Sequence, residues 1–589
     1  MEDGKVWKTL SSSEGVRQGD ALSSFLFALS MVNIYNDTTK ETECLFAAVQ
    51  DDYYIIGPPE QAAVAWEKFC SLCKSSTGLK INRNKTQILL PTGSEGKELA
   101  NEGLVLKRDW IPALGTILTR NDKTAEKWLV EESRKKHDKM FELLKDKKMP
   151  AQVAYILVRM SMAPSINFWL RTSNPSRTAK LAEEFDQKLL TAMTSILDLP
   201  HLEEVARKQL VMPISKGGFG IRSASLTAKP AWISAMAQAM RANYSLLLRG
   251  VHPTGKWVKN VEKTTNALKG LKMKTHLPID GKVFWDTFGL HPAESGLQRE
   301  ITEAVLGEEQ EKIYKQAERN GTDYARMVGL QCKESGLWLT AMPIHTLLRM
   351  RDVSFQLAAR ARLGVSLATG VKSCACGVEL QSTPLHLLSC RHLVATMNLR
   401  HNKVLSTLLA IAGMTLVTAR KEVTIDDEGR KRTDGLFVVK GKATMIDVSI
   451  ICPTAKSYVK AARKSLGAAL IREKQKIDKY DKEVKKHEMD FIPFVIETTG
   501  GMGGKAKRLI DQLMDEALAN NATSFVPDRV DLFIKRAVAV AVQIGNGMVA
   551  QEGIRRARGR KWKGAISEVR GKVKKKERRR GPGGGGGVE

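Results

Sequence analysis

A short window in the second half of the chain strongly constrains what it can fold into. Three of the eight cysteines and one histidine fall in this window, with the spacing Cys374-x-Cys376-x9-His386-x3-Cys390. Three thiolates and one imidazole are a ligand set that tetrahedral Zn²⁺ takes in structural sites. The residues between them, including Gly377 and Pro384, favour turns, which argues against four side chains that are simply buried in a core. The spacing therefore predicts a small zinc-binding module.

Composition narrows the class of protein. The 589 residues, 43% of them hydrophobic, are enough for about three to five domains with cores of their own. The 93 Lys and Arg exceed the 64 Asp and Glu by 29, which favours a polyanionic partner. The longest apolar stretch, Ala537 to Ala550, is interrupted by Gln543 and Asn546 and is shorter than the roughly 18 residues that a membrane span needs. With sparse cysteines and no targeting pattern at the start, we expect an intracellular protein with no membrane partner.

Positive charge concentrates near the C-terminus. From Arg555 to Arg580, fourteen Lys and Arg stand against two Glu, a local excess of 12, and a glycine run follows. We expect a disordered basic tail that contacts nucleic acid, with a solubilising terminus as the alternative. The candidate contacts in this tail are Arg555, Arg556, Lys574, Lys575 and Lys576.

Two adjacent acids, Asp51 and Asp52, lie between the apolar runs Leu45–Val49 and Tyr53–Ile56. Adjacent carboxylates at a hairpin tip repel each other unless a cation shares them, so the pattern predicts a Mg²⁺ site; an exposed acidic turn is the alternative. Upstream, the segment from Gly15 to Ser23 is expected to begin a helix, with Arg17 and Gln18 at its anion-binding end.

Together these segments resemble the reverse transcriptase palm of LINE-type (non-LTR) retrotransposons, which shows Arg-Gln-Gly-Asp-Pro-Leu-Ser-Pro followed by an aromatic-x-Asp-Asp turn. Gly78 to Asn82, Lys85 and Leu114-Gly115 continue the family pattern in order, whereas Val49-Gln50, Ala21 and Ser24 depart from it. The resemblance implies that Asp51 is a catalytic magnesium ligand with Asp52 beside it. It places Arg17, Gln18 and Gly19 near the incoming nucleotide and the template, and Lys85 near the phosphates.

The family's other metal-binding Asp lies on a strand well before the Arg-Gln-Gly-Asp block, and here fourteen residues precede Gly15. Two-metal phosphoryl transfer needs carboxylates from two strands. We therefore expect that this chain alone does not polymerise. The helical stretch after Leu114 resembles the family's thumb and the region that follows it; its Gly217-Gly218-Phe219-Gly220 loop is given no chemistry.

A second pair of acids lies on the two strands of a predicted hairpin. Asp434 and Asp447 lie on strands joined by Lys440-Gly441-Lys442, so the hairpin brings them together, as a Mg²⁺ site or as edge acids that balance nearby Arg and Lys. In order along the chain, Arg400-His401, Asp434 and Asp447 resemble the restriction-like endonuclease of the same elements, which implies phosphodiester cleavage.

The same resemblance points to further residues. Ser449 stands where the restriction-enzyme core usually has lysine, and the helix expected over Ala455–Lys486 offers Lys476, with Tyr480 on the same face. Glu497, at the end of the apolar strand Phe491–Ile496, is a third candidate acid. Arg400 and His401 are candidate nucleic-acid contacts.

The Cys/His window resembles the family's knuckle between polymerase and endonuclease; because the last gap there is usually one residue longer, His392 remains an alternative ligand.

The combined prediction is an α/β multidomain protein, the C-terminal portion of a retrotransposon polyprotein of the restriction-like-endonuclease class, similar to spliced-leader-inserting elements of trypanosomatids. It implies a nuclear protein with Mg²⁺ and Zn²⁺ as cofactors and an RNA template and a DNA target as partners. The alternative is a degenerate remnant that binds nucleic acid without catalysis. The expected parts are a partial palm (1–118), thumb-like helices (119–249), a helical linker (250–372), the knuckle (373–393), an endonuclease domain (394–545) and the basic tail (546–589).

Overall fold

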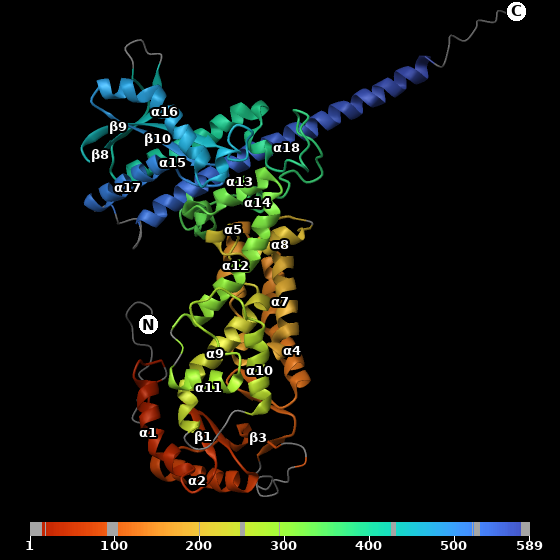
Figure 1. Cartoon of the computed structure of the whole chain (residues 1–589), viewed down its shortest axis with the longest axis vertical. Helices are drawn as coiled ribbons and strands as arrows, with labels where there is room; N and C mark the ends of the chain where they lie inside the picture. The colour runs from red at the N-terminus through yellow and green to blue at the C-terminus, as the bar shows by residue number, and fades with distance from the viewer. Residues whose placement is uncertain are drawn as a thin grey trace, which may run out of the picture. The chain divides into compact units, whose positions relative to one another are not determined.

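The computed structural model describes most of the chain. Its described residues are 15–17, 19–90, 93, 104–199, 201–247, 254–291, 293, 295–425, 431–520, 522 and 530–578, without the side chains of 241–247 and 560–578. The chain divides into two compact units, residues 1–132 with 176–181 (unit 1) and residues 133–175 with 182–589 (unit 2). Both are shown in Figure 1, and the fold is mixed α/β, mainly helical with small sheets.

Unit 1 contains the predicted acidic hairpin. Its strands β1 and β2 pair antiparallel, with Val49 opposite Asp52, so the expected hairpin is confirmed. The helix α2 ends at Gly78, which adopts the left-handed conformation that favours glycine at this position. The elements are α1 (Ser23–Thr38), β1 (Leu45–Val49), β2 (Asp52–Ile56), α2 (Pro59–Thr77), η1 (Arg83–Lys85), β3 (Gln87–Leu89), β4 (Val105–Lys107), β5 (Trp110–Ala113) and β6 (Thr116–Thr119).

The first helix begins later than the sequence predicts. Gly19 has a φ of 88°, and the backbone N–H of Leu22 donates to the Asp20 carboxylate at 2.9 Å, which closes a turn before the helix. The helix α1 therefore starts at Ser23, and Arg17 precedes it by six residues. The expectation that Arg17 sits at a helix N-terminus was wrong.

A helix that both units share, α4 (Asp122–Leu144), leads into the helical part of unit 2. Asn121 caps α4, because its side chain accepts from the N–H groups of Lys123 and Thr124. The following elements are α5 (Ala151–Leu157), the π-turn η2 (Val158–Met162), α6 (Asn167–Thr172), α7 (Pro175–Ile196), α8 (Glu204–Val211), η3 (Ile214–Lys216), α9 (Ala224–Leu247), α10 (Gly255–Asn266), α11 (Gly281–Leu290), α12 (Leu297–Glu318), α13 (Gly321–Leu330), η4 (Lys333–Thr340), η5 (Thr346–Leu348) and α14 (Asp352–Leu363).

Unit 2 also contains a four-stranded sheet in the order β10-β9-β8-β7. The β8–β9 hairpin turns within the predicted Lys440-Gly441-Lys442 segment; Val439 pairs with Lys442, and the positive φ angles of Lys440 and Gly441, 50° and 69°, fit a two-residue turn. β10 pairs parallel to β9, and α15, α16 and α17 pack on the sheet (Figure 1). The elements are η6 (His386–Ser389), η7 (Arg391–Leu393), α15 (Val394–Met414), β7 (Ala419–Thr424), β8 (Arg432–Val439), β9 (Lys442–Ile451), η8 (Ala461–Arg463), α16 (Gly467–Lys486), β10 (Asp490–Glu497) and α17 (Gly504–Ala519).

The helix α16 is shorter than predicted. It begins at Gly467 rather than at Ala455, because Leu466 has a left-handed φ of 57° and so interrupts any continuous helix. The residues before it form turns and η8. This difference leaves an irregular segment between β9 and α16.

The last element, α18 (Val530–Arg578), differs from the disordered basic tail that the sequence predicts from Arg555, because a helix continues to Arg578. Its first half is buried against α14, α15 and α17, and the helix continues through the basic residues to Arg578. Lys, Arg and Ala have high helix propensity, so they extend a helix that packing has already nucleated.

Two helical stretches, Ala151–Thr172 and Val530–Gly559, are long and apolar enough to cross a membrane by length and composition alone. The second passes this test despite its interruptions because Gln543 and Asn546 lie in an otherwise apolar helix. Both side chains donate to the Thr498 carbonyl, at 3.2 and 2.8 Å. These polar groups are thus satisfied inside unit 2, as in a core helix; the absence of a membrane partner stays a prediction.

Candidate metal centre and acidic site

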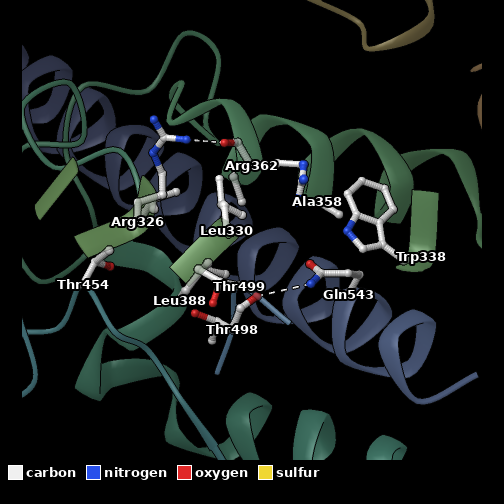
Figure 2. A pocket seen from close by; sticks show the side chains of 12 residues that line it. Arg326, Leu330, Trp338, Ala358, Arg362, Leu388, Thr454, Thr498, Thr499 and Gln543 are labelled. Atoms are coloured by element: carbon white, nitrogen blue, oxygen red, sulfur yellow. Dashed lines mark hydrogen bonds between the residues drawn. The ribbon is translucent and has the colours of Figure 1, made fainter. Parts of the chain in front are cut away.

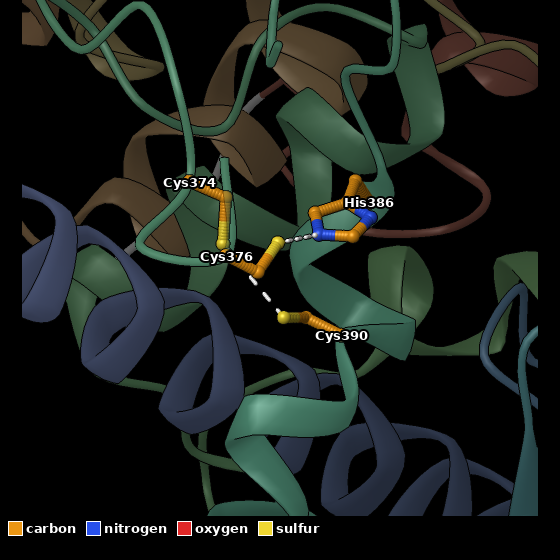
Figure 3. Close-up of side chains that lie close together, drawn as sticks. All are labelled: Cys374, Cys376, His386 and Cys390. Atoms are coloured by element: carbon orange, nitrogen blue, oxygen red, sulfur yellow. Dashed lines mark hydrogen bonds between the residues drawn. The ribbon is translucent and has the colours of Figure 1, made fainter. Parts of the chain in front are cut away.

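The four residues of the Cys/His window come together in the structure. Their ligand atoms all lie within 4.8 Å of one another (Figure 3). The sulfur atoms of Cys374 and Cys390 are 3.7 Å apart, and Cys376 Sγ lies 3.1 Å from His386 Nε2. Two thiolates on tetrahedral Zn²⁺, with Zn–S of about 2.3 Å, lie about 3.8 Å apart, so the donor set fits zinc.

Local structure holds these ligands in place. Gly377, at a φ of 95°, turns the chain so that Cys374 N–H donates to Val378 O at 2.8 Å. Leu380, Leu387 and Leu388 bury one side of the cluster against Val549 and Ala550 of α18. His392, the alternative ligand, does not belong to the cluster; its carbonyl accepts from Arg556 at 2.6 Å.

The acids of the β8–β9 hairpin also face each other. Gly435 pairs with Ile446, so Asp434 and Asp447, the next residues outward, lie opposite each other on neighbouring strands. Asp434 Oδ2 accepts from the Val448 N–H at 2.6 Å and lies 2.9 Å from His401 Nε2. Burial lowers the pKa of His401, but the hydrogen bond and the charge of Asp434 outweigh it, so the pKa lies above its ordinary value.

Helix α16 contributes a cation to this site. Lys476 Nζ lies 2.6 Å from Asp447 Oδ2, with only 13% of the lysine side chain and 5% of the aspartate side chain exposed. Burial raises the pKa of Asp447, and the ammonium group acts against that increase. Nζ also lies 5.5 Å from the ring centre of Tyr480, the predicted neighbour on the same helix face. The structure thus brings together Asp434, Asp447 and Lys476 from three elements.

One cation beside this site is absent from the sequence-based prediction. The Arg472 Nε donates to Ser449 Oγ at 3.4 Å, and Ser449 is the residue that the resemblance aligns with a lysine. Helix periodicity could have predicted this residue from the sequence, because Arg472 precedes Lys476 by four residues on the same helix and therefore shares its face.

Two predicted site residues are placed elsewhere. Glu497 lies opposite Ile451 in the parallel register, four residues beyond Asp447, which corresponds to about 13 Å along the strand. Its carboxylate accepts from the Ala469 N–H at 3.4 Å and from Thr499 Oγ1 at 3.3 Å. Burial raises the pKa of Glu497 to about 7. Glu497 is therefore not part of the acidic pair.

Arg400 also departs from its predicted role as a nucleic-acid contact. Its side chain is buried, and Nη1 donates to Leu388 O and Asn546 Oδ1, both at 3.2 Å. Burial lowers the pKa of Arg400 to about 10. It joins α15 to α18 and does not present its charge to solvent. His401, predicted for the same role, lies on Asp434 instead.

Other predicted nucleic-acid contacts lie at the surface. Arg555 and Arg556 both donate to Glu552, and Arg556 also reaches His392 O beside the Cys/His cluster. The side chains of Lys574, Lys575 and Lys576 lie outside the described residues.

In unit 1, Asp51 and Asp52 are exposed at the hairpin tip. Gln50 at the same tip has a φ of 56°, and its carbonyl accepts from Tyr35 Oη at 3.2 Å. The predicted template contacts Arg17 and Gly19 and the phosphate contact Lys85 are exposed, and Gln18 lies outside the described residues. The hairpin therefore presents the two carboxylates, and their metal-binding role stays a prediction.

The polar side chains that line a small pocket of unit 2 mainly hydrogen-bond to backbone carbonyls. Figure 2 shows that Arg326 reaches the Arg362 carbonyl and that Gln543 reaches the Thr498 carbonyl. The Arg362 guanidinium donates to the carbonyls of Gly218, Ser335 and Ile214, at 2.8 to 3.1 Å. These buried arginines hold the glycine loop, whose role is thus packing.

Comparison with known proteins identifies a distant relative. Over 523 residues the chain is 24% identical to the "Retrotransposable element SLACS 132 kDa protein" of Trypanosoma brucei gambiense. The relative is a retrotransposon protein. The alignment covers 86% of this chain and 37% of the relative, and it supports a relation to non-LTR retrotransposon proteins. No protein-family model matches the sequence.

Proposed function

We propose that this chain corresponds to the C-terminal portion of a non-LTR retrotransposon polyprotein of the restriction-like-endonuclease class, and that its sheet carries a Mg²⁺-dependent DNA-nicking site. The observation that carries the proposal is the Lys476–Asp447 contact of 2.6 Å, with Asp434 opposite. A cation on a buried carboxylate beside a second carboxylate is the constellation that phosphodiester cleavage uses.

The donors fit a magnesium ion. Mg²⁺ prefers carboxylate oxygens, and in the described part of the chain Asp434 Oδ1 makes no hydrogen bond. Asp434 and Asp447 would hold the ion, which when bound polarises a phosphoryl oxygen and lowers the pKa of a water ligand. His401 orients Asp434 through its hydrogen bond. Lys476 supplies positive charge where negative charge develops on the phosphate.

The other modules extend this proposal. Unit 1 would contain part of a reverse transcriptase palm, with Asp51 and Asp52 as magnesium ligands, and would act on an RNA template. The Cys/His cluster would bind zinc as a knuckle beside the endonuclease. The DNA target is chromosomal, so the protein would act in the nucleus. Support for this extension is the distant retrotransposon relative together with the motif order along the chain.

Nicking of supercoiled plasmid tests the endonuclease. We expect the purified chain to convert supercoiled into open-circular DNA with Mg²⁺ and not in the same buffer without Mg²⁺. Asp434→Asn and Asp447→Asn should abolish the reaction. Asp490→Asn is a matched control, because Asp490 lies on the neighbouring strand and pairs with Lys442 at 2.8 Å. Nicking that persists in Asp447→Asn contradicts the site, whereas DNA binding without nicking by the wild type favours a non-catalytic remnant.

A further inference from the structure

The irregular segment between β9 and α16 is strongly basic. Its four cationic side chains are all exposed, and we call them the basic segment. The chain has no acidic residue between Asp447 and Glu473. In the described part of the chain, none of its three lysines pairs with a carboxylate, and its arginine lies over the Tyr324 ring at 5.2 Å. The basic segment consists of Lys456, Lys460, Arg463 and Lys464.

Other exposed lysines around the same sheet differ in this respect. Lys440 lies 2.7 Å from Asp515, Lys442 lies 2.8 Å from Asp490, and Lys485 lies 2.7 Å from Asp481. Their charge is locally balanced. In the basic segment four like charges fall within nine residues without such partners, which costs repulsion energy that a polyanion would relieve.

The backbone of the segment is anchored at both ends. Cys452 is buried and Ala455 packs beside the Cys/His cluster. Ala462 is buried among Ile451 and Val495 of the sheet. The cations are therefore presented from a fixed base, which suits binding of a rigid ligand.

The position of the segment points to one ligand. It leaves β9 four residues after Asp447, about 13 Å along the strand. It then enters α16, which places Lys476 on Asp447 and Arg472 on Ser449, two residues further along the same strand. Positive side chains thus run from the acidic pair along the sheet end to the Cys/His cluster.

We propose that the basic segment binds the phosphate backbone of duplex DNA a few base pairs from the Asp434–Asp447 pair; the inference rests on the proposed nicking function. DNA is favoured over RNA because the segment is continuous with the strand and the helix that carry Asp447 and Lys476. Contacts of this kind position a duplex and carry no base specificity.

The test is equilibrium binding by the full chain, with its zinc retained, to a fluorescent duplex of about 30 base pairs in Mg²⁺-free buffer, titrated at several salt concentrations. The variant Lys456→Gln/Lys460→Gln/Arg463→Gln/Lys464→Gln should reduce the slope of log K against log salt by about 3 to 4 in magnitude and weaken binding at least tenfold. The control Lys440→Gln/Lys442→Gln/Lys485→Gln/Lys486→Gln removes the same charge from ion-paired positions and should change the slope by less than one.

Equal slope changes in both variants would overturn the proposal, as would a loss confined to a duplex RNA of the same length. Binding in Mg²⁺-free buffer does not depend on nicking, so a wild type that binds with the expected slope but does not nick defeats only the proposed function. If the quadruple variant does not fold, as judged by thermal unfolding, Lys460→Gln/Lys464→Gln should give half of the slope change, and no change would again overturn the proposal.

Discussion

The ammonium group of Lys476 forms a buried ion pair with Asp447, although the two residues lie on a helix and on a strand of unit 2. Lys476→Ala should lower the single-turnover nicking rate by about 10² or more, because loss of one preorganised electrostatic group in an active site has that magnitude. Lys479→Ala is the control: Lys479 Nζ donates to Tyr480 Oη at 2.8 Å and also lies over its ring, but it does not contact Asp447. Equal losses in the two variants would exclude a specific role for Lys476.

Zinc should be present at one ion per chain by elemental analysis of the purified protein. A strong chelator should then lower the thermal unfolding temperature, because metal binding contributes to folding free energy. Cys390→Ser should reduce the zinc content and the unfolding temperature together. Cys70→Ser, on α2 of unit 1, should retain full zinc content. A wild type without zinc would refute the assignment.

Asn546→Ala should destabilise unit 2 by about 1–3 kcal/mol, the cost of leaving buried polar groups without partners. The change removes one of the two acceptors of Arg400 and one donor to the Thr498 carbonyl. Urea or thermal unfolding followed by fluorescence measures it. Arg400→Met should likewise lower stability. If this variant instead bound DNA more weakly with unchanged stability, the result would support the predicted role of Arg400 as a nucleic-acid contact.

Stability should depend on pH through His137. This side chain is buried against Trp169 and Phe185, and burial lowers its pKa below the ordinary value of about 6.5. The unfolded chain therefore binds more protons than the folded one, so the contribution is full above pH 6.5 and is lost as the pH falls through the folded pKa. Unfolding temperatures measured from pH 7.5 to 5 should fall less steeply in His137→Leu, whereas His201→Gln, at an exposed site, should follow the wild type.

Features set by neighbouring residues could be predicted from the sequence. The Cys/His spacing, the Asp51–Asp52 hairpin and the Lys440–Gly441 turn all depend on residues that are close in the chain, and the structure contains each of them. The pairing of Asp434 with Asp447 followed for the same reason, because one tight turn determines the register. Lys476 was chosen because the resemblance implies a helix with a lysine and a tyrosine after the second acid, and helix periodicity then placed Tyr480 on the same face.

Features set by distant partners could not be predicted. Arg400 is buried because α18, nearly 150 residues later, packs over it. Glu497 misses the acidic pair because the register of a parallel strand is not determined by any turn. The late start of α16 depends on a single left-handed residue, Leu466, which has no sequence signature.

The course of α18 has a mechanical consequence. Val549 and Ala550 pack on the Cys/His cluster, while Asn546, one turn earlier, bonds to Arg400 of α15 and to the loop after β10. One helix therefore contacts both the Cys/His cluster and the sheet domain. These contacts oppose independent movement of the cluster and the sheet. Under the proposed function, DNA bound at both places would meet the Cys/His cluster and the Asp434–Asp447 pair at one fixed separation, set by this helix.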